Sequence, residues 1–273
     1  MVSTHLAMGN HKEALRLCTL SLNIRLETLG ERDPDVAASY NNMATTHLVM
    51  GNHKEALRLY TLSLNIRLET LGERHPDVAA SYNNMANTHD DMGNHKEALR
   101  LYTLSLDITL ETLGERHPVV ATSYNNMANT HLAMGNHKEA LRLYTLSLDI
   151  TLETLGERHP DVATSYHNMG CLYETTGELH LALDCLTKAM TIRTDTLPDN
   201  HPDLKSTRAE METVKNRLQT QQTHVLPSSP TGNAGSSFAE ETAQSTVVGA
   251  VGHSDESVSA TRTRQSSSFC RIL

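Results

Sequence analysis

Apolar and small side chains recur at helical spacing along most of this chain, in pairs of segments joined by a Gly-Asn pair. Within residues 77–118, the stripe of the first segment is Tyr82, Met85, Ala86 and His89. The matching stripe of the second segment is Ala98, Leu101, Tyr102 and Ser105. Spacings of three and four residues are typical of amphipathic helices. The pattern predicts helices from about Asp77 to Met92 and from about His95 to Leu113, packed through these stripes as a hairpin. The small Ala86 and Ala98 allow close approach.

The hairpin returns along the chain as an internal repeat. Residues 77–118 and 119–160 differ only at Asp77/Val119, Ala80/Thr122, Asp90/Leu132 and Asp91/Ala133. A period of 42 residues separates each member of two series: Gly9, Gly51, Gly93, Gly135 and Gly177, and Pro34, Pro76, Pro118, Pro160 and Pro202. Such self-similarity predicts a helical repeat array. Its units are an incomplete N-terminal repeat at 1–34, repeats at 35–76, 77–118 and 119–160, and a divergent repeat at 161–202.

Local signals mark where the helices begin and end. Proline suits the first position of a helix, and the aspartate that follows in most units suits the positive end of the helix dipole. These aspartates are Asp35, Asp77, Asp161 and Asp203. Each glycine of the series suits a left-handed residue that ends a helix. The following Asn-His-Lys-Glu predicts a capping box, for example Asn94 with Glu97.

The two ends of the chain differ from the repeats. Residues 1–8 supply only half of a first helix, so this unit frays, continues upstream, or is capped by something else. Residues 203–219 have a narrow apolar stripe amid charged side chains, which predicts a C-terminal capping helix. From about Thr220 the composition shifts to Ser, Thr, Gln, Gly and Pro, so residues 220–273 are predicted to be a disordered tail.

Composition and charge narrow the class of partner. With no Trp and two Phe, the apolar content is carried by Leu, Met, Ala and Tyr, which favours an all-α protein. A formal net charge of −9 disfavours nucleic acid and anionic membrane as partners. No segment has the ~20 consecutive apolar residues of a membrane span, and no secretory signal is present, so the cytoplasm is the expected location.

The cysteines do not form a disulfide pattern. Cys18, Cys171, Cys185 and Cys270 show no paired spacing. Cys18 stands where later repeats have Tyr60, Tyr102 and Tyr144, which indicates a substitution in the core.

The repeats resemble the tetratricopeptide family. Its signature, W-x2-L-G-x2-Y, then A-x3-F, then P, is matched in kind by Tyr82, Met85, Ala86, His89, Ala98, Tyr102 and Pro118. The fifth unit matches it better, with Tyr166, Met169, Gly170, Tyr173 and Ala182. The longer period, the Y-N-N-x-A first helix and the L-G-x-x-H-P link are similar to those of kinesin light chains. The resemblance implies a right-handed superhelical solenoid of antiparallel helix pairs and a role in binding other proteins.

A groove along the first helices is the expected binding site, because stacked hairpins form a concave wall there. A polar stripe lies beside the packing stripe of these helices: Asn41, Asn83, Asn87, Asp90, Asn125, Asn129 and His167. Amide side chains both donate and accept hydrogen bonds, so a ladder of them suits a peptide backbone of any sequence. The family resemblance implies contact with cargo peptides for Asn41, Asn83 and Asn125. The alternative is that these amides solvate an exposed face or join adjacent hairpins.

Charged residues give further hints about the ligand. The wall of the third unit carries Asp90 and Asp91, which predicts either a ligand with a basic residue or a solvated acidic helix end. A carboxylate clamp, as in relatives that bind chaperone tails, is not supported. The basic residues lie instead on the second helices, which should face outward: Lys96, Arg100, Lys138 and Arg142.

Catalysis, metals and cofactors are not indicated. The sequence has 16 histidines, and His89 with His95 recurs in other units, but no copy adds the acid or thiol cluster that metal sites require. His89 takes the place of a core aromatic residue. Near-identical repeats offer no unique catalytic site, and no Ser-His-Asp grouping or phosphate loop is present. We therefore expect no enzyme activity.

The chain ends in Cys270, Arg271, Ile272 and Leu273. This fits the C-a-a-X form of a prenylation site, with terminal Leu favouring geranylgeranyl, although Arg271 is not aliphatic. One lipid chain would anchor the protein only weakly. The alternative is a cysteine near the C-terminus by chance.

These observations support three hypotheses of function. The first is a non-enzymatic adaptor that binds an extended peptide or partner segment in its groove. The second is a kinesin light chain-type motor subunit that binds cargo, disfavoured because no heptad pattern precedes the repeats. The third is the sensor arm of a larger enzyme or nucleotide-driven receptor, which would account for the half unit at the start.

Overall fold

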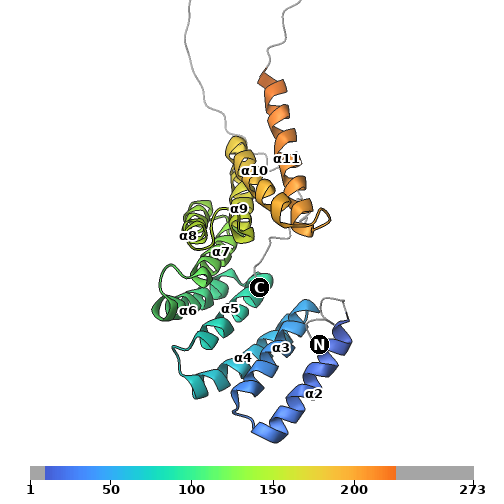
Figure 1. The fold of residues 1–273 in the computed structure, drawn as a ribbon, viewed down its shortest axis with the longest axis vertical. Helices are drawn as coiled ribbons and strands as arrows, with labels where there is room; N and C mark the ends of the chain where they lie inside the picture. Colours follow the sequence, from blue (N-terminus) through green and yellow to red (C-terminus); the bar gives the residue numbers. More distant parts are fainter. Residues whose placement is uncertain (1–9, 226–273) are drawn as a thin grey trace, which may run out of the picture.

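The structure, a computed structural model, describes residues 10–225 and is entirely helical in that part (Figure 1). The helices are α2 (His11–Leu29), α3 (Pro34–Val49), α4 (His53–Leu71), α5 (Pro76–Asp91), α6 (His95–Leu113), α7 (Pro118–Ala133), α8 (His137–Leu155), α9 (Pro160–Thr176), α10 (Leu179–Thr196) and α11 (Pro202–Val225). The predicted all-α class is confirmed. Helix α2 corresponds in the repeat to the second helices α4, α6 and α8.

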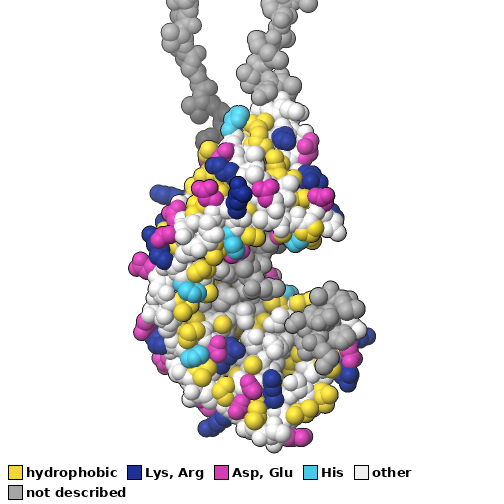
Figure 2. All heavy atoms as spheres, viewed as in Figure 1, with side chains coloured by type: hydrophobic (Ala, Val, Ile, Leu, Met, Phe, Trp, Pro, Cys, Tyr) yellow, Lys and Arg dark blue, Asp and Glu magenta, His cyan; other side chains and the backbone are white. Residues whose placement is uncertain are grey.

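The helices pair as hairpins that stack into a curved solenoid. In Figure 1, α6 and α8 lie on the outer side of the curve, and their partners α5 and α7 lie closer to its opening. The space-filling view shows a hollow on the same side of the molecule (Figure 2). The predicted arrangement of adjacent antiparallel pairs is therefore confirmed, and in the α5–α6 and α7–α8 hairpins the first helix lies on the inner side.

Each hairpin is held together by the predicted stripes. Ala86 and Ala98 are fully buried, and with Leu101 and Tyr102 they form one cluster against Tyr82 and Met85. Neighbouring hairpins are joined through a second kind of cluster: Leu106, Val120, Ala121 and Ile150. Within the hairpin, Ser105 of α6 donates to the Ala79 carbonyl of α5 at 2.8 Å. One set of stripes thus closes a unit, and another stacks it on the next.

A histidine side chain caps the first helix of most units. The Nδ1 atom of His75 accepts from the Asp77 backbone N–H at 3.1 Å, and proline follows as the first helical residue. His117, His159 and His201 make the same bond, and Asp33 does so in the second unit. The expected prolines are confirmed, and the histidine of each His-Pro pair supplies the cap.

The Gly-Asn turn forms as expected, but the predicted capping box does not. Gly93 has a φ of 76°, and the Asn94 N–H donates to the His89 carbonyl at 2.8 Å. Asn94 makes no side-chain capping bond. The Glu97 carboxylate instead accepts from Arg100 at 2.7 Å, because an arginine one turn along the helix competes for it.

The last helix is longer than predicted. It runs from Pro202 to Val225, so residues 220–225 belong to the capping helix and not to a disordered tail. Its apolar stripe packs on α10 through Val214 and Leu218. Residues 1–9 and 226–273, with the predicted tail and Cys270, lie outside the described part.

Candidate binding surface on the inner helices

The asparagine ladder bridges neighbouring hairpins at two places. Asn84 donates through Nδ2 to Asn41 Oδ1 at 3.1 Å, which joins α5 to α3. Asn168 donates in the same way to Asn125 Oδ1 at 2.9 Å, joining α9 to α7. At these places the amides contribute to stacking. Asn41 is half-buried, and Asn125 is almost fully buried.

The next rung of the ladder bonds to a core tyrosine. The Tyr102 hydroxyl donates to Asn87 Oδ1 at 2.5 Å, within one hairpin. Tyr144 makes the same bond to Asn129. Both tyrosines and both asparagines are buried, and burial raises the pKa of the Tyr144 hydroxyl. These asparagines therefore satisfy a phenol that the core would otherwise leave without a partner.

Tyr144→Phe is expected to lower the free energy of unfolding by about 1–3 kcal/mol, because Asn129 Oδ1 would remain buried without its donor. Urea unfolding followed by circular dichroism measures this change. Tyr124→Phe is the matched control, since Tyr124 is only half-buried. Equal effects of the two substitutions would show that the hydroxyl bond contributes nothing.

Asp90 and His167 are also engaged inside the array. Asp90 is 5% exposed, and its Oδ1 atom lies 2.7 Å from His95 Nδ1 across the turn. A solvated acidic helix end, one of the two alternatives, is therefore wrong for Asp90, whereas Asp91 is exposed. His167 is 5% exposed, with Nδ1 3.3 Å from the Thr207 hydroxyl of α11. Desolvation, and the charge of Arg193, lower the pKa of His167 to about 4.

Asn83 lies at a pocket between three helices. The pocket has a volume of about 370 Å³ and is lined by Pro76, Ala79, Ala80, Asn83 and Asn84 of α5, by Ser105, Thr109, Thr112 and Leu113 of α6, and by Val119, Thr122 and Ser123 of α7. Ser105, Thr109 and Ser123 are buried at its base. Leu113 and Val119 are 40% and 46% exposed at its rim.

This pocket brings together Asn83, which was predicted to line the groove, and Ala80, one of the positions at which residues 77–118 and 119–160 differ. It adds residues of α6, above all Thr109, which the sequence analysis did not single out. The signal was present, because Thr109 stands 42 residues after Arg67 and so replaces an arginine of the preceding repeat.

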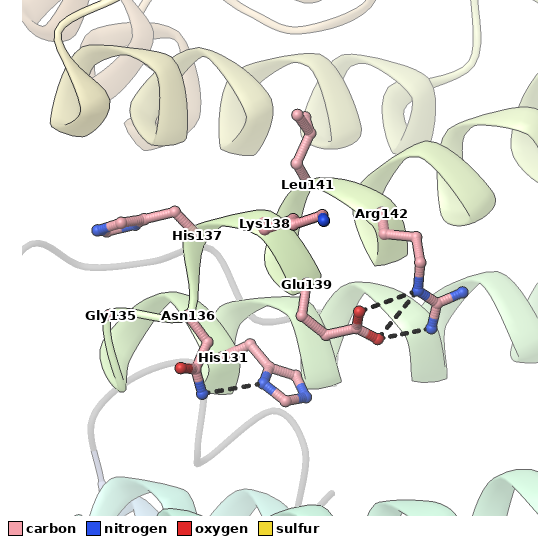
Figure 3. A pocket seen from close by; sticks show the side chains of 8 residues that line it. All are labelled: His131, Gly135, Asn136, His137, Lys138, Glu139, Leu141 and Arg142. Atoms are coloured by element: carbon pink, nitrogen blue, oxygen red, sulfur yellow. Dashed lines mark hydrogen bonds and ion pairs between the residues drawn. The ribbon is translucent and has the colours of Figure 1, made fainter.

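A second kind of pocket lies at the hairpin turns. Figure 3 shows the one at the α7–α8 turn, of about 730 Å³, lined by His131, Gly135, Asn136, His137, Lys138, Glu139, Leu141 and Arg142. Asn136 Nδ2 lies 3.5 Å from His131 Nδ1, and Glu139 pairs with Arg142 at 2.6 Å. A similar pocket occurs at the α3–α4 turn. In the α7–α8 pocket Glu139 is already paired with Arg142, and the same type of pocket recurs at another turn. We therefore regard the pocket between α5, α6 and α7 as the stronger candidate.

Basic residues of the second helices face outward, as the sequence predicts. Arg58, Arg100 and Arg142 are exposed on these helices, and each pairs with a glutamate one turn earlier.

Within residues 10–225, no group of three or more His, Cys, Asp or Glu side chains could hold a metal ion. In that same part, no helix is long and apolar enough to cross a bilayer.

Comparison with protein families decides the classification. The model described as "Tetratricopeptide repeat" matches four overlapping stretches: residues 1–69, 35–111, 77–152 and 119–195. The chain belongs to the tetratricopeptide repeat family. Repeats of this family bind protein partners, and the chain is a scaffold suited to protein–protein interaction. A search of curated proteins finds no match.

Solved structures place this tetratricopeptide chain near kinesin light chain-like proteins. A putative kinesin light chain from P. anserina with nearly identical repeats is 26% identical, with a TM-score of 0.60, covering 72% of this chain and 94% of that one. A variant of it is 27% identical, with a TM-score of 0.61, covering 71% and 92%. BtubC (BKLC) from P. vanneervenii has a TM-score of 0.61 and covers 85% and 99%, but at 19% identity it shows the fold alone. The predicted resemblance is confirmed.

Proposed function

We propose that this chain is a non-enzymatic adaptor that binds an extended segment of a partner protein along its inner helices. The observation that carries the proposal is the pocket between α5, α6 and α7, which has Asn83 in its wall. The hollow in Figure 2 gives an extended segment room to contact several units.

The environment of each ladder residue suggests its part in binding. Asn83 and Asn41 are half-buried, so their amides are the ones we assign to direct contact with a peptide backbone. The other ladder residues are nearly fully buried, and we assign them a supporting part that holds the inner helices in place: Asn87, Asp90, Asn125, Asn129 and His167.

Asn83→Ala is expected to weaken binding of a selected peptide about tenfold, because one lost hydrogen bond of this kind corresponds to about 1.4 kcal/mol. Peptides would first be selected from a random library with the full chain, and affinities then measured by fluorescence anisotropy. Asn65→Ala is the matched control, since Asn65 is exposed on the second helix α4. If both variants bind every selected peptide as tightly as the wild type, the inner-face proposal is wrong.

A kinesin light chain-type cargo subunit is the second candidate, because the P. anserina relatives at 26% and 27% identity are described as a putative kinesin light chain. Co-purification of the native protein with a kinesin heavy chain would support it. If the native protein purifies without a heavy chain but still binds its peptide, the motor-subunit hypothesis is wrong and the adaptor proposal stands.

A further inference from the structure

An arginine near the end of the second helix ties several units to the next. Arg67 of α4 donates through Nη1 to the Asp77 carbonyl at 2.9 Å and to Ser81 Oγ at 2.8 Å. Both acceptors belong to the start of α5. The guanidinium thus fills the junction between one hairpin and the first helix of the following one.

The same junction is built twice more. Arg25 donates to the Asp35 carbonyl at 3.1 Å and to Ser39 Oγ at 2.7 Å. Arg193 donates to the Asp203 carbonyl at 3.0 Å and to the Thr207 hydroxyl at 2.5 Å. At each of these three junctions, one backbone carbonyl and one side-chain hydroxyl, a turn apart, accept hydrogen bonds from the same arginine nitrogen. The repeat therefore contains a guanidinium-binding geometry.

The junction between α6 and α7 keeps the acceptors but lacks the arginine. Thr109 stands 42 residues after Arg67, and its hydroxyl donates to Ser105 of its own helix at 2.8 Å. Val119 and Ser123 stand where Asp77 and Ser81 stand, and Ser123 Oγ donates to the Val119 carbonyl at 3.1 Å, much as Ser81 does to Asp77 at 3.0 Å.

The missing side chain coincides with the pocket beside Asn83. Thr109, Val119 and Ser123 all line that space of about 370 Å³. The α2–α3, α4–α5 and α10–α11 junctions hold an arginine of the chain itself, whereas the α8–α9 junction carries Thr151 at this position. The α6–α7 junction holds a cavity that exposed Ala80 and half-buried Asn83 also line. Because three equivalent junctions hold arginine side chains of the chain itself, the cavity is expected to fit a guanidinium group.

We propose that this pocket binds an arginine side chain of the partner segment, which inserts its guanidinium against the Val119 carbonyl and Ser123 Oγ. The amide oxygen of Asn83 supplies a further acceptor, and exposed Leu113 and Val119 cover the methylene stem. The chain's net charge of −9 favours a basic partner. This inference rests on the proposed adaptor function and names one residue that the ligand must carry.

Neutral acceptors alone should hold the guanidinium weakly. The sister site of Arg67 has Asp77 beside it, whereas Val119 brings no carboxylate. Arginine should therefore add specificity to a segment that gains the rest of its affinity along neighbouring helices. An isolated probe is expected to bind in the millimolar range, on the order of 4 kcal/mol.

The first experiment titrates the full chain with methylguanidinium and observes the Thr109 methyl group and the Asn83 amide by NMR. Saturable shifts of both are expected, with much smaller shifts for methylammonium, which cannot present a planar fork. If methylguanidinium leaves both signals unmoved, or methylammonium moves them equally, the arginine pocket is wrong.

The second experiment fills the pocket from within. Thr109→Arg should reproduce the Arg67 bonds, abolish the methylguanidinium shifts at Asn83 and weaken a selected arginine peptide at least about tenfold. Thr103→Arg is the matched control, because Thr103 is exposed on α6; it should bind like the wild type. Equal binding by Thr109→Arg and Thr103→Arg overturns the proposal even if the wild type binds peptides.

The same experiments separate this inference from the adaptor proposal. If peptide binding falls in Asn83→Ala but not in Thr109→Arg, the groove stands and the arginine pocket fails. If Thr109→Arg removes the methylguanidinium shifts while no peptide is ever selected, the pocket stands and the adaptor proposal fails.

A third experiment asks whether arginines of the chain itself occupy the pocket, and it uses the full chain with Arg262→Gln, Arg264→Gln and Arg271→Gln. If methylguanidinium causes shifts only in that variant, the pocket belongs to these arginines and the proposal of a partner's arginine is overturned.

Discussion

Arg193→Thr is expected to lower the free energy of unfolding by about 3 kcal/mol and to loosen the last helix from the array. Arg193 is 2% exposed, and its guanidinium bonds to the Asp203 carbonyl and the Thr207 hydroxyl of α11. Its other terminal nitrogen lies 3.5 Å from the Thr164 hydroxyl of α9. Removing the guanidinium would remove its hydrogen bonds to these groups at the point where three helices meet.

The repeat itself supplies the replacement, because Thr109 and Thr151 occupy the equivalent position of the preceding units. Threonine is therefore compatible with the helix, and the loss reports on the contacts. Urea unfolding gives the free energy, and amide hydrogen exchange shows whether α11 opens first. Arg208→Thr is the control, since Arg208 is exposed on the same helix. A loss no greater than that of the control would mean that Arg193 does not fasten α11.

The architecture was predictable because each unit repeats the same local signals. The stripe through Tyr82 and Ala86, the glycine at the turn and the proline at the helix start all agree with one another, and they recur at one period. The cap was missed because the usual capping residues are Ser, Thr, Asp and Asn. The Nδ1 atom of His75 takes the same acceptor role two residues before Asp77.

The ladder illustrates what helical spacing cannot decide. Spacing places Asn83 and Asn87 on one face of α5, but it does not say which neighbour each amide bonds to. The Tyr102 hydroxyl of the same hairpin donates to Asn87, and Asn84 donates to Asn41 of the neighbouring unit. Partners 15 and 43 residues away follow from the packing of complete hairpins, and one unit alone does not contain them.

The sequence comparison did not reveal the pocket, because the two repeats that were compared in detail carry the same residue at the decisive position. Residues 77–118 and 119–160 both carry threonine, at Thr109 and Thr151, so their near identity conceals the change. Comparison with residues 35–76 shows Arg67 at that position. A substitution between repeats becomes informative once the structure shows that the arginine crosses to the next unit.

Between pH 6.5 and about 4, His167 is expected to make the array less stable by as much as about 3 kcal/mol. The folded protein holds this imidazole neutral, because burial and the charge of Arg193 lower its pKa from 6.5 to about 4. The unfolded chain takes up the proton first as the pH falls. The stability contributed by neutral His167 is therefore complete above pH 6.5 and is lost as the pH approaches 4.

The matched variant is His167→Asn, because asparagine occupies this position in the preceding repeats as Asn41, Asn83 and Asn125. Urea unfolding of both proteins at intervals from pH 7 to pH 4 gives two curves, and their difference isolates His167 from the other histidines that both proteins share. The curves should converge as the pH falls, with the wild type losing more stability. Curves that stay parallel would show that His167 titrates alike in the folded and unfolded states, and that burial and the charge of Arg193 do not hold it neutral.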